Sequence, residues 1–272
     1  MKKKSLYILI ISIVLCISLL LINMLIINPK QLKIREETVI TNDSNLDGLL
    51  IAYFSDIHYG NNFNENNLDK VLNKLNEFKP DLIIFGGDLL SNIKKGNEDY
   101  LKEALSNLKP KYGKIAVMGD DDYLNDRAYN ILLESNFSIL NNSHKKININ
   151  NSFINVVGIE ALINGNPNIE NAFEGINDTY YTISVSHCPD IVNRLGDLKT
   201  NLFLSGHSLG GPIYIPLINY LYRPNGAKNY YHGKYKIENM VLDISNGVGT
   251  IKKDIRLFAD AEIVFYRFKK SS

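Results

Sequence analysis

The sequence has little of what several classes of protein require. Two cysteines in 272 residues are too few for a disulfide framework or a thiolate metal cluster, so any metal must be held by oxygen and imidazole. Neither sign of charge is in excess, because 30 Lys and Arg face 29 Asp and Glu. Beyond Lys2, Lys3 and Lys4 the chain has no basic block, and we therefore expect no nucleic-acid partner.

One long apolar run is present at the start of the chain. The 23 residues from 5 to 27 are almost wholly apolar, and at about 1.5 Å each they make a helix long enough to cross a hydrocarbon core of about 30 Å. We expect residues 1–28 to be a single-pass anchor in the cell membrane, with the Lys cluster in the cytoplasm and the rest outside. A cleaved signal peptide, which also begins with such a cluster, is the alternative.

The remainder is predicted to be a polar tether, 29–48, and one domain, 49–270. Short apolar runs at 49–54, 82–85 and 115–118 alternate with helical stripes at 68–78 and 100–108. This β-α-β-α-β order predicts an α/β fold with a parallel sheet. The pattern then predicts a helix around 129–133 and strands around 137–140, 154–159, 183–186 and 202–204. Apolar runs at 241–244, 255–258 and 263–268 predict a β-rich closure.

Candidate metal-ligating and catalytic residues follow the predicted strands at the points where each one ends. They are Asp56, His58, Asp88, Asp120, Asp121, His187 and His207. In open α/β sheets the carboxyl ends of strands converge on one crevice. Carboxylates gathered there repel one another and lose hydration, which divalent cations would offset.

This ordered set resembles the calcineurin-like metallophosphoesterases. Their pattern runs D-x-H, G-D, G-N-H-D or G-N-H-E, a later His, and G-H-x-H, and the likeness covers about residues 49–268. Further motifs at 186–190, 210–212, 245–249 and 255–258 are similar to the membrane-associated, single-domain branch of that family.

The resemblance implies a two-sheet αββα sandwich after one transmembrane helix, and two divalent ions, Mn, Mg or Fe. It also implies a phosphoesterase that hydrolyses phosphodiester or lipid-linked phosphate substrates, small molecules or lipids, through attack by a metal-bound hydroxide. Residues carried over by position supply the ligands: Asp56 and His58 for the first metal, Asp88 as the bridge, and Asp120, His187 and His207 for the second.

Three motif positions depart from the family pattern. Asp120 stands where the family has Asn, and its negative charge should strengthen the second site. Asp121 replaces the substrate-facing His, and it can act as the catalytic acid only if its pKa is raised. Leu209 replaces the second His of G-H-x-H and cannot bind a metal, so the first site should be weaker. The alternative function is a degenerate member that binds one metal or a phosphorylated ligand without turnover.

Four further features can be interpreted as purely structural or as functional. His232 could replace the lost ligand, but an exposed loop position is simpler. His144 is expected in a turn and Cys188 as a small packed side chain. The tyrosine-rich run 214–222 could hold an apolar or sugar-bearing substrate near the bilayer, or pack in the core or rim.

Overall fold

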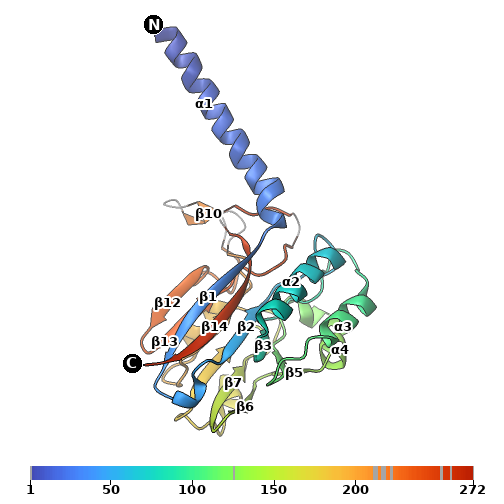
Figure 1. Cartoon of the computed structure of the whole chain (residues 1–272), viewed down its shortest axis with the longest axis vertical. Coiled ribbons are helices and arrows are strands. Elements are labelled where there is room, and N and C mark those ends of the chain that lie inside the picture. The colour runs from blue at the N-terminus through green and yellow to red at the C-terminus, as the bar shows by residue number, and fades with distance from the viewer. Residues whose placement is uncertain are drawn as a thin grey trace.

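The structure is a computed structural model that describes residues 2–124, 126–210, 214–215, 219–220, 223–251, 254–257 and 259–271. Within these residues the strands form two six-stranded sheets and one short hairpin. The first sheet has the strand order β1-β14-β2-β3-β4-β5, and the second has the order β12-β13-β9-β8-β7-β6. Figure 1 shows how these elements are arranged.

Each sheet collects strands from distant parts of the chain. The first contains β1 (Leu32–Thr41), β14 (Ala261–Lys270), β2 (Leu50–Phe54), β3 (Leu82–Phe85), β4 (Lys114–Ala116) and β5 (Phe137–Ile139). The second contains β12 (Gly233–Ile237), β13 (Met240–Ile244), β9 (Leu202–Ser205), β8 (Tyr181–Val185), β7 (Ser152–Gly158) and β6 (Ser143–Ile149). The hairpin pairs β10 (Tyr214–Ile215) with β11 (Asn219–Tyr220).

One hydrophobic core lies between the two sheets. Ile51, Tyr53 and Ile84 of the first sheet pack in one cluster with Val156 and Leu204 of the second. Because side chains alternate across a strand, the opposite faces of both sheets also carry apolar residues that need cover.

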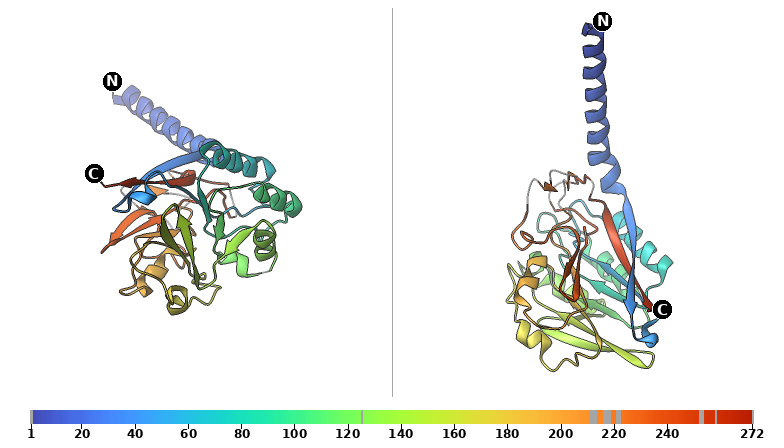
Figure 2. Two further views of the ribbon diagram at one scale, coloured as in Figure 1. Left: turned by 60° about the horizontal axis from the view of Figure 1, so that its bottom comes forward. Right: turned by 90° about the vertical axis from the view of Figure 1, so that its left-hand side faces the viewer.

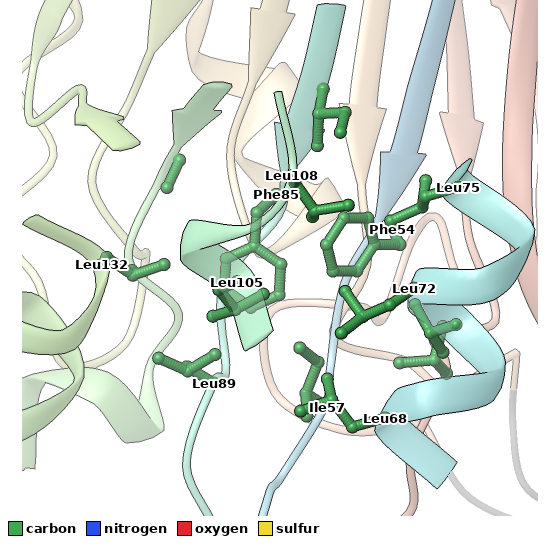
Figure 3. Close-up of a cluster of buried hydrophobic side chains, with 14 of the residues drawn as sticks. Phe54, Ile57, Leu68, Leu72, Leu75, Phe85, Leu89, Leu105, Leu108 and Leu132 are labelled. Carbon is green, nitrogen blue, oxygen red and sulfur yellow. The ribbon is translucent and has the colours of Figure 1, made fainter. Parts of the chain in front are cut away.

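Helices cover those outer faces. The first sheet is covered by α2 (Glu65–Phe78), α3 (Glu98–Ser106) and α4 (Arg127–Glu134). Figure 3 shows Leu72 of α2 beside Phe54 of β2, and Leu105 of α3 beside Phe85 of β3. The second sheet packs against α5 (Ile169–Phe173) and the 3-10 segment Pro189–Arg194. The predicted two-sheet αββα sandwich is therefore confirmed.

The helix stripe at 68–78 has clear start and stop signals. Asn64 accepts a hydrogen bond from the Asn67 backbone, and the Asn67 side chain bonds back to the Asn64 backbone. This capping box satisfies two backbone donors at the start of α2. At the other end Lys79 adopts a left-handed conformation, with Pro80 directly after it, which ends the helix where the sequence predicts.

The N-terminal apolar helix stands away from the domain (Figures 1 and 2). α1 (Lys2–Ile22) continues through a π-helical turn (Asn23–Ile27) and a 3-10 turn (Asn28–Lys30). The span Lys4–Ile27 is long and apolar enough to cross a membrane, and the domain buries none of its most apolar window. This helix fits a membrane anchor.

The segment predicted as a polar tether, 29–48, contains strand β1. β1 pairs in parallel with β14, from Leu32 opposite Ala261 to Thr41 opposite Lys270. It occupies the edge of the sheet, where one neighbour supplies the backbone hydrogen bonds, so its many charged residues can face solvent. The Arg35 side chain also pairs with the buried carboxylates of Asp243 and Glu262 at 2.9 and 3.1 Å. Only Gln31 separates the last helical turn, which ends at Lys30, from β1, so the connection between the N-terminal helix and the sheet is short.

The apolar run at 255–258, predicted to add a strand, differs too. Its described part, 255–257, belongs to no named strand, and Phe258 lies outside the described residues. The reason is Arg256, whose guanidinium is buried and donates to four backbone carbonyls, those of Asn246, Gly247, Gly249 and Ala259. The Arg256 backbone N–H also donates to Met24 O at 3.2 Å, so it is not available to a neighbouring strand.

Candidate metal centre

The seven candidate residues lie where strands of both sheets end. β2, β3 and β4 run parallel in the first sheet, and β8 and β9 run parallel in the second. Their carboxyl ends therefore point the same way within each sheet. The loops that follow these strands carry the candidates: Asp56 and His58 after β2, Asp88 after β3, Asp120 and Asp121 after β4, His187 after β8, and His207 after β9.

Their ligand atoms converge into three groups. Within each group the atoms lie within 4.8 Å of one another. The groups are Asp56 with Asp88 and His187, Asp120 with His187 and His207, and His58 with Asp88 and Asp121. Asp88 is central, because its Oδ2 atom lies 3.0 Å from His187 Nε2 and 3.7 Å from His58 Nε2. All seven residues are thus brought to one place.

Several of these atoms are buried without a hydrogen-bond partner. They are Asp56 Oδ1 and both ring nitrogens of His58. A buried polar atom left unpaired costs about 1–3 kcal/mol, so a cluster of them needs a ligand. Carboxylate oxygens and imidazole nitrogens are the donors that Mg²⁺, Mn²⁺ and Fe²⁺ accept. The residues present therefore fit divalent metal ions.

The pKa shifts within the cluster also indicate a site for positive charge. Burial opposes ionisation of the Asp88 carboxyl, but the imidazoles of His187 and His58 hold its pKa below the usual range. Burial likewise disfavours the charged form of His187, yet the Asp88 and Asp56 carboxylates raise its pKa well above the ordinary value. These carboxylates thus attract positive charge strongly.

The site loops hold an unusual backbone. Asp56, His58, Asp88 and His207 have φ values of 57°, 47°, 58° and 67°, a left-handed conformation that costs a non-glycine residue roughly 1–2 kcal/mol. Bonds between the loops hold it, because the Asp56 N–H donates to Gly87 O at 2.9 Å and the His58 N–H to Asp88 O at 3.1 Å. The strained residues are thus candidate ligands, whose side chains must be oriented toward the metal site.

Asp122 is a site residue to which the sequence analysis gave no role. Its buried carboxylate accepts the backbone N–H groups of Asp88, Leu89 and Gly119 at 2.8–2.9 Å. It thereby ties the loop after β3 to the loop after β4. Burial, with the nearby Asp88 charge, raises the pKa of Asp122 to about 7. The final acidic residue of the G-N-H-D pattern was the available signal.

Asp120 is surrounded by hydrogen-bond donors. Its Oδ1 accepts the N–H groups of Ile163 and Asn164 at 2.8 and 2.9 Å, and its Oδ2 accepts the Cys188 thiol at 2.9 Å. Oδ2 also lies 3.6 Å from His207 Nδ1. An amide at this position could not accept at both ends, so the surroundings suit a carboxylate.

We therefore expect Asp120→Asn to weaken the second metal site, although it restores the residue of the family pattern. The amide would present either N–H groups to the backbone donors of Ile163 and Asn164, or a neutral donor toward the cation position. Metal affinity measured by titration calorimetry should fall about 10–100-fold. Asp126→Asn, which removes an exposed charge nearby, is the control. Unchanged affinity in Asp120→Asn would contradict this account.

The other singled-out residues lie outside these groups. His232 is half-buried and its Nδ1 lies 3.1 Å from Asn246 Oδ1. His144 is in β6 rather than a turn, with Nδ1 3.2 Å from Ala172 O. Leu209 is buried, with φ of 53°. Most of the motif at 210–212 and of the run 214–222 lies outside the described residues, as do all side chains of 214–222.

A comparison with known protein families agrees with this geometry. Residues 49–246 match the calcineurin-like phosphoesterase family. The chain belongs to this family. As a member of it, the protein is a metal-dependent phosphoesterase, which confirms the predicted hydrolase class.

Curated relatives from several bacteria are similar along most of the chain. Metallophosphoesterase YkuE of Bacillus subtilis (strain 168) is 27% identical over 253 residues, 90% of this chain and 88% of the relative. Metallophosphoesterase YkoQ of the same strain is 30% identical, with coverage of 69% and 72%. UDP-2,3-diacylglucosamine pyrophosphatase LpxG of Chlamydia muridarum (strain MoPn / Nigg) is 25% identical, with coverage of 82% and 84%.

The loop after β13 is hydrogen-bonded to the loop that carries Asp56, and Arg256 holds its backbone in place. Val248 N–H donates to Ser55 O, and Gly249 N–H donates to Asp56 O at 2.8 Å. The Arg256 guanidinium binds three carbonyls of this loop as well as Ala259 O. Burial lowers the pKa of Arg256 to about 10, against the raising effect of Asp56, so the group stays charged at neutral pH.

Arg256→Met should destabilise the domain by about 3–5 kcal/mol, because four buried carbonyls would lose their donor. The expected result is a clear fall in the melting temperature of the full chain in detergent. Arg267→Met is the matched control, since the Arg267 side chain is 42% exposed and its ion pair with Glu36 at 3.6 Å should contribute less than about 1 kcal/mol. Equal melting temperatures for both variants would contradict the role given to Arg256.

Proposed function

We propose that the protein is a membrane-anchored phosphoesterase that hydrolyses phosphodiester or lipid-linked phosphate substrates outside the cytoplasm. The observation that supports this proposal most strongly is that buried, unpaired carboxylate and imidazole atoms converge where strands of both sheets end. Two divalent ions there would polarise the phosphoryl oxygens and lower the pKa of an attacking water. The relative LpxG, a pyrophosphatase of a diacylated sugar nucleotide by name, supports a lipid-linked substrate.

The chain's own residues would hold the ions in fixed positions. Asp88 Oδ2 lies 3.7 Å from Nε2 of His58, a ligand of the first metal, and 3.0 Å from Nε2 of His187, a ligand of the second, which supports its assignment as the bridging ligand. His187 is oriented by a hydrogen bond between its Nδ1 and Gly86 O at 2.8 Å, which leaves Nε2 toward the centre. His207 is oriented in the same way by Asn225 O at 2.6 Å from its Nε2, which leaves Nδ1 toward Asp120.

Asp121 is proposed as the residue that completes the first site in place of a histidine at Leu209. Its Oδ2 lies 3.7 Å from His58 Nδ1, and its backbone N–H donates to Asp88 Oδ1 at 2.9 Å. Burial and the Asp88 carboxylate raise the pKa of Asp121. A cation held among Asp121, Asp88 and His58 would remove this repulsion.

Hydrolysis of bis-p-nitrophenyl phosphate by the full chain in detergent tests the activity. Added Mn²⁺ should support turnover and a chelator should abolish it, with recovery when Mn²⁺ is returned in excess. Mn²⁺ binding by calorimetry should be measured on the same sample. Binding without hydrolysis of this or any diester would favour the degenerate, non-catalytic alternative.

The orientation has its own test. The Lys cluster at the N-terminus should keep that end in the cytoplasm. Protease added to intact protoplasts should digest the domain, while a tag placed before α1 should survive until the membrane is permeabilised. Protection of the domain in intact protoplasts would overturn the proposed location.

A further inference from the structure

The end of the membrane helix is bonded to the loop beside Asp56. The Arg256 backbone N–H donates to Met24 O at 3.2 Å, while its guanidinium donates to Gly249 O at 2.6 Å. Gly249 in turn donates to Asp56 O at 2.8 Å. Two residues therefore connect the apolar span to a candidate metal ligand, and the centre cannot move far from the helix.

The covalent connection is equally short. β1 begins at Leu32, two residues after the helical turns end, and Leu32 is paired with Ala261. The next residue, Glu262, donates its N–H to Gly247 O at 3.1 Å. A carbon added at Gly247 would lie 2.7 Å from Asp56 Cβ, which shows how closely this strand junction approaches the site.

The length of the span places this junction at the bilayer surface. From Lys4, a hydrocarbon core of about 30 Å takes about 20 residues at 1.5 Å each, which ends near Met24. The polar headgroup layer adds about 5–7 Å beyond that boundary. The loop held by Arg256, and Asp56 beside it, then lies at about headgroup depth.

Exposed aliphatic side chains are present at the same end of the sheets as the centre. Ile93, Leu124, Ile163 and Ile251 are 54%, 59%, 45% and 39% exposed, and each lies in a different loop or turn that follows a strand at that end. The β10–β11 hairpin follows His207 in the chain and lies beside the base of α1 in Figures 1 and 2. In sequence, residues 213–222 contain no charged side chain. A polar centre with exposed apolar side chains at the same end of the sheets suits a phosphorylated headgroup with its apolar chain.

We propose that the catalytic end of the domain rests on the bilayer and that its substrate is a phosphodiester or pyrophosphate of a lipid in that same membrane. This inference rests on the proposed phosphoesterase function and adds where the scissile phosphorus is found. The short connection through Arg256 and β1 holds the centre at headgroup depth, so a bilayer-resident substrate reaches it by lateral diffusion.

Depth measurement tests the placement without any need for activity. In a Cys16→Ser background, with Cys188 buried, single cysteines replace Ile251 and, as control, Ile40. Ile40 is 62% exposed and lies eight residues along β1 from Leu32, roughly 26 Å away. In phosphatidylcholine and phosphatidylglycerol vesicles, a fluorophore at position 251 should be quenched by nitroxide-labelled headgroups and one at 40 should not. Equal accessibility of both labels would overturn the placement.

Two substrates with the same p-nitrophenyl leaving group test the consequence. One is free bis-p-nitrophenyl phosphate, and the other is a p-nitrophenyl phosphodiester of diacylglycerol in the same vesicles. A flexible Gly-Ser insertion after Lys30 should lower the rate on the lipid diester about tenfold, because the effective concentration falls, and leave the free diester unchanged. The same insertion appended to the C-terminus is the control. An equal effect on both substrates would refute the inference, whereas inactivity of the unmodified chain on both would refute the proposed function alone.

Discussion

Asp88→Asn should lower turnover by more than about 100-fold and should be the most damaging of the ligand substitutions. The Asp88 carboxylate lies close to ligands of both metals, with Oδ2 3.7 Å from His58 Nε2 and 3.0 Å from His187 Nε2, so its loss should affect both metal positions at once. The substitution also affects a hydrogen bond. Asp88 Oδ1 accepts the Asp121 N–H at 2.9 Å, and an amide in its place must turn its NH₂ group either toward that donor or toward the cation.

The measurement is metal content together with rate on bis-p-nitrophenyl phosphate. Both should fall in parallel, while the melting temperature without metal should change little, because the backbone bonds that Asp122 makes to the same loop remain. Asp99→Asn, at a side chain 99% exposed on α3, controls for loss of one charge. Full occupancy and full turnover in Asp88→Asn would show that the bridging assignment is wrong.

Asp121→Asn should weaken the first metal site about 10–100-fold, and Leu209→His should restore much of the loss. The reason is that Asp121 and a histidine at 209 would supply the same missing ligand. Leu209 already has a left-handed φ of 53°, which histidine tolerates better than most residues. Titration of the unmodified chain should show one tight and one weaker ion, with turnover following the weaker one because both are needed.

The rescue separates two roles for Asp121. A ligand lost at 121 can be replaced by a ligand at 209, whereas a proton donor to the leaving group cannot. Metal affinity and rate should therefore recover together in the double variant, a strong non-additive coupling. Leu209→Phe, which adds a ring without nitrogen, is the control and should rescue nothing. If Leu209→His recovers affinity without rate, Asp121 acts as the catalytic acid instead.

Candidate ligands could be found from the sequence because each follows a strongly apolar strand. β2, β3, β8 and β9 are buried along nearly their whole length, so their sequences are almost continuous apolar runs. Parallel strands in one sheet end at one edge, and polar residues just past those runs therefore meet. The same logic explains why α2 and α3 were predictable, since their buried residues repeat at helical spacing.

Elements at the margins were harder to predict. β1 and β12 mix charged and apolar residues at sheet edges, a pattern close to that of a polar linker. The burial of the Arg256 side chain could not be predicted either, because the sequence does not show which four backbone carbonyls it binds.

The sequence by itself determined the family, the apolar span and the order of the ligand motifs, because these depend on residue type and spacing along the chain. Only the tertiary structure decided that Asp121 lies beside His58, that Asp122 braces two loops, and that the span ends against the loop next to Asp56. The physical reason is that these contacts join segments far apart in sequence. Their geometry is set by how the two sheets pack and by hydrogen bonds between loops, which no local pattern encodes.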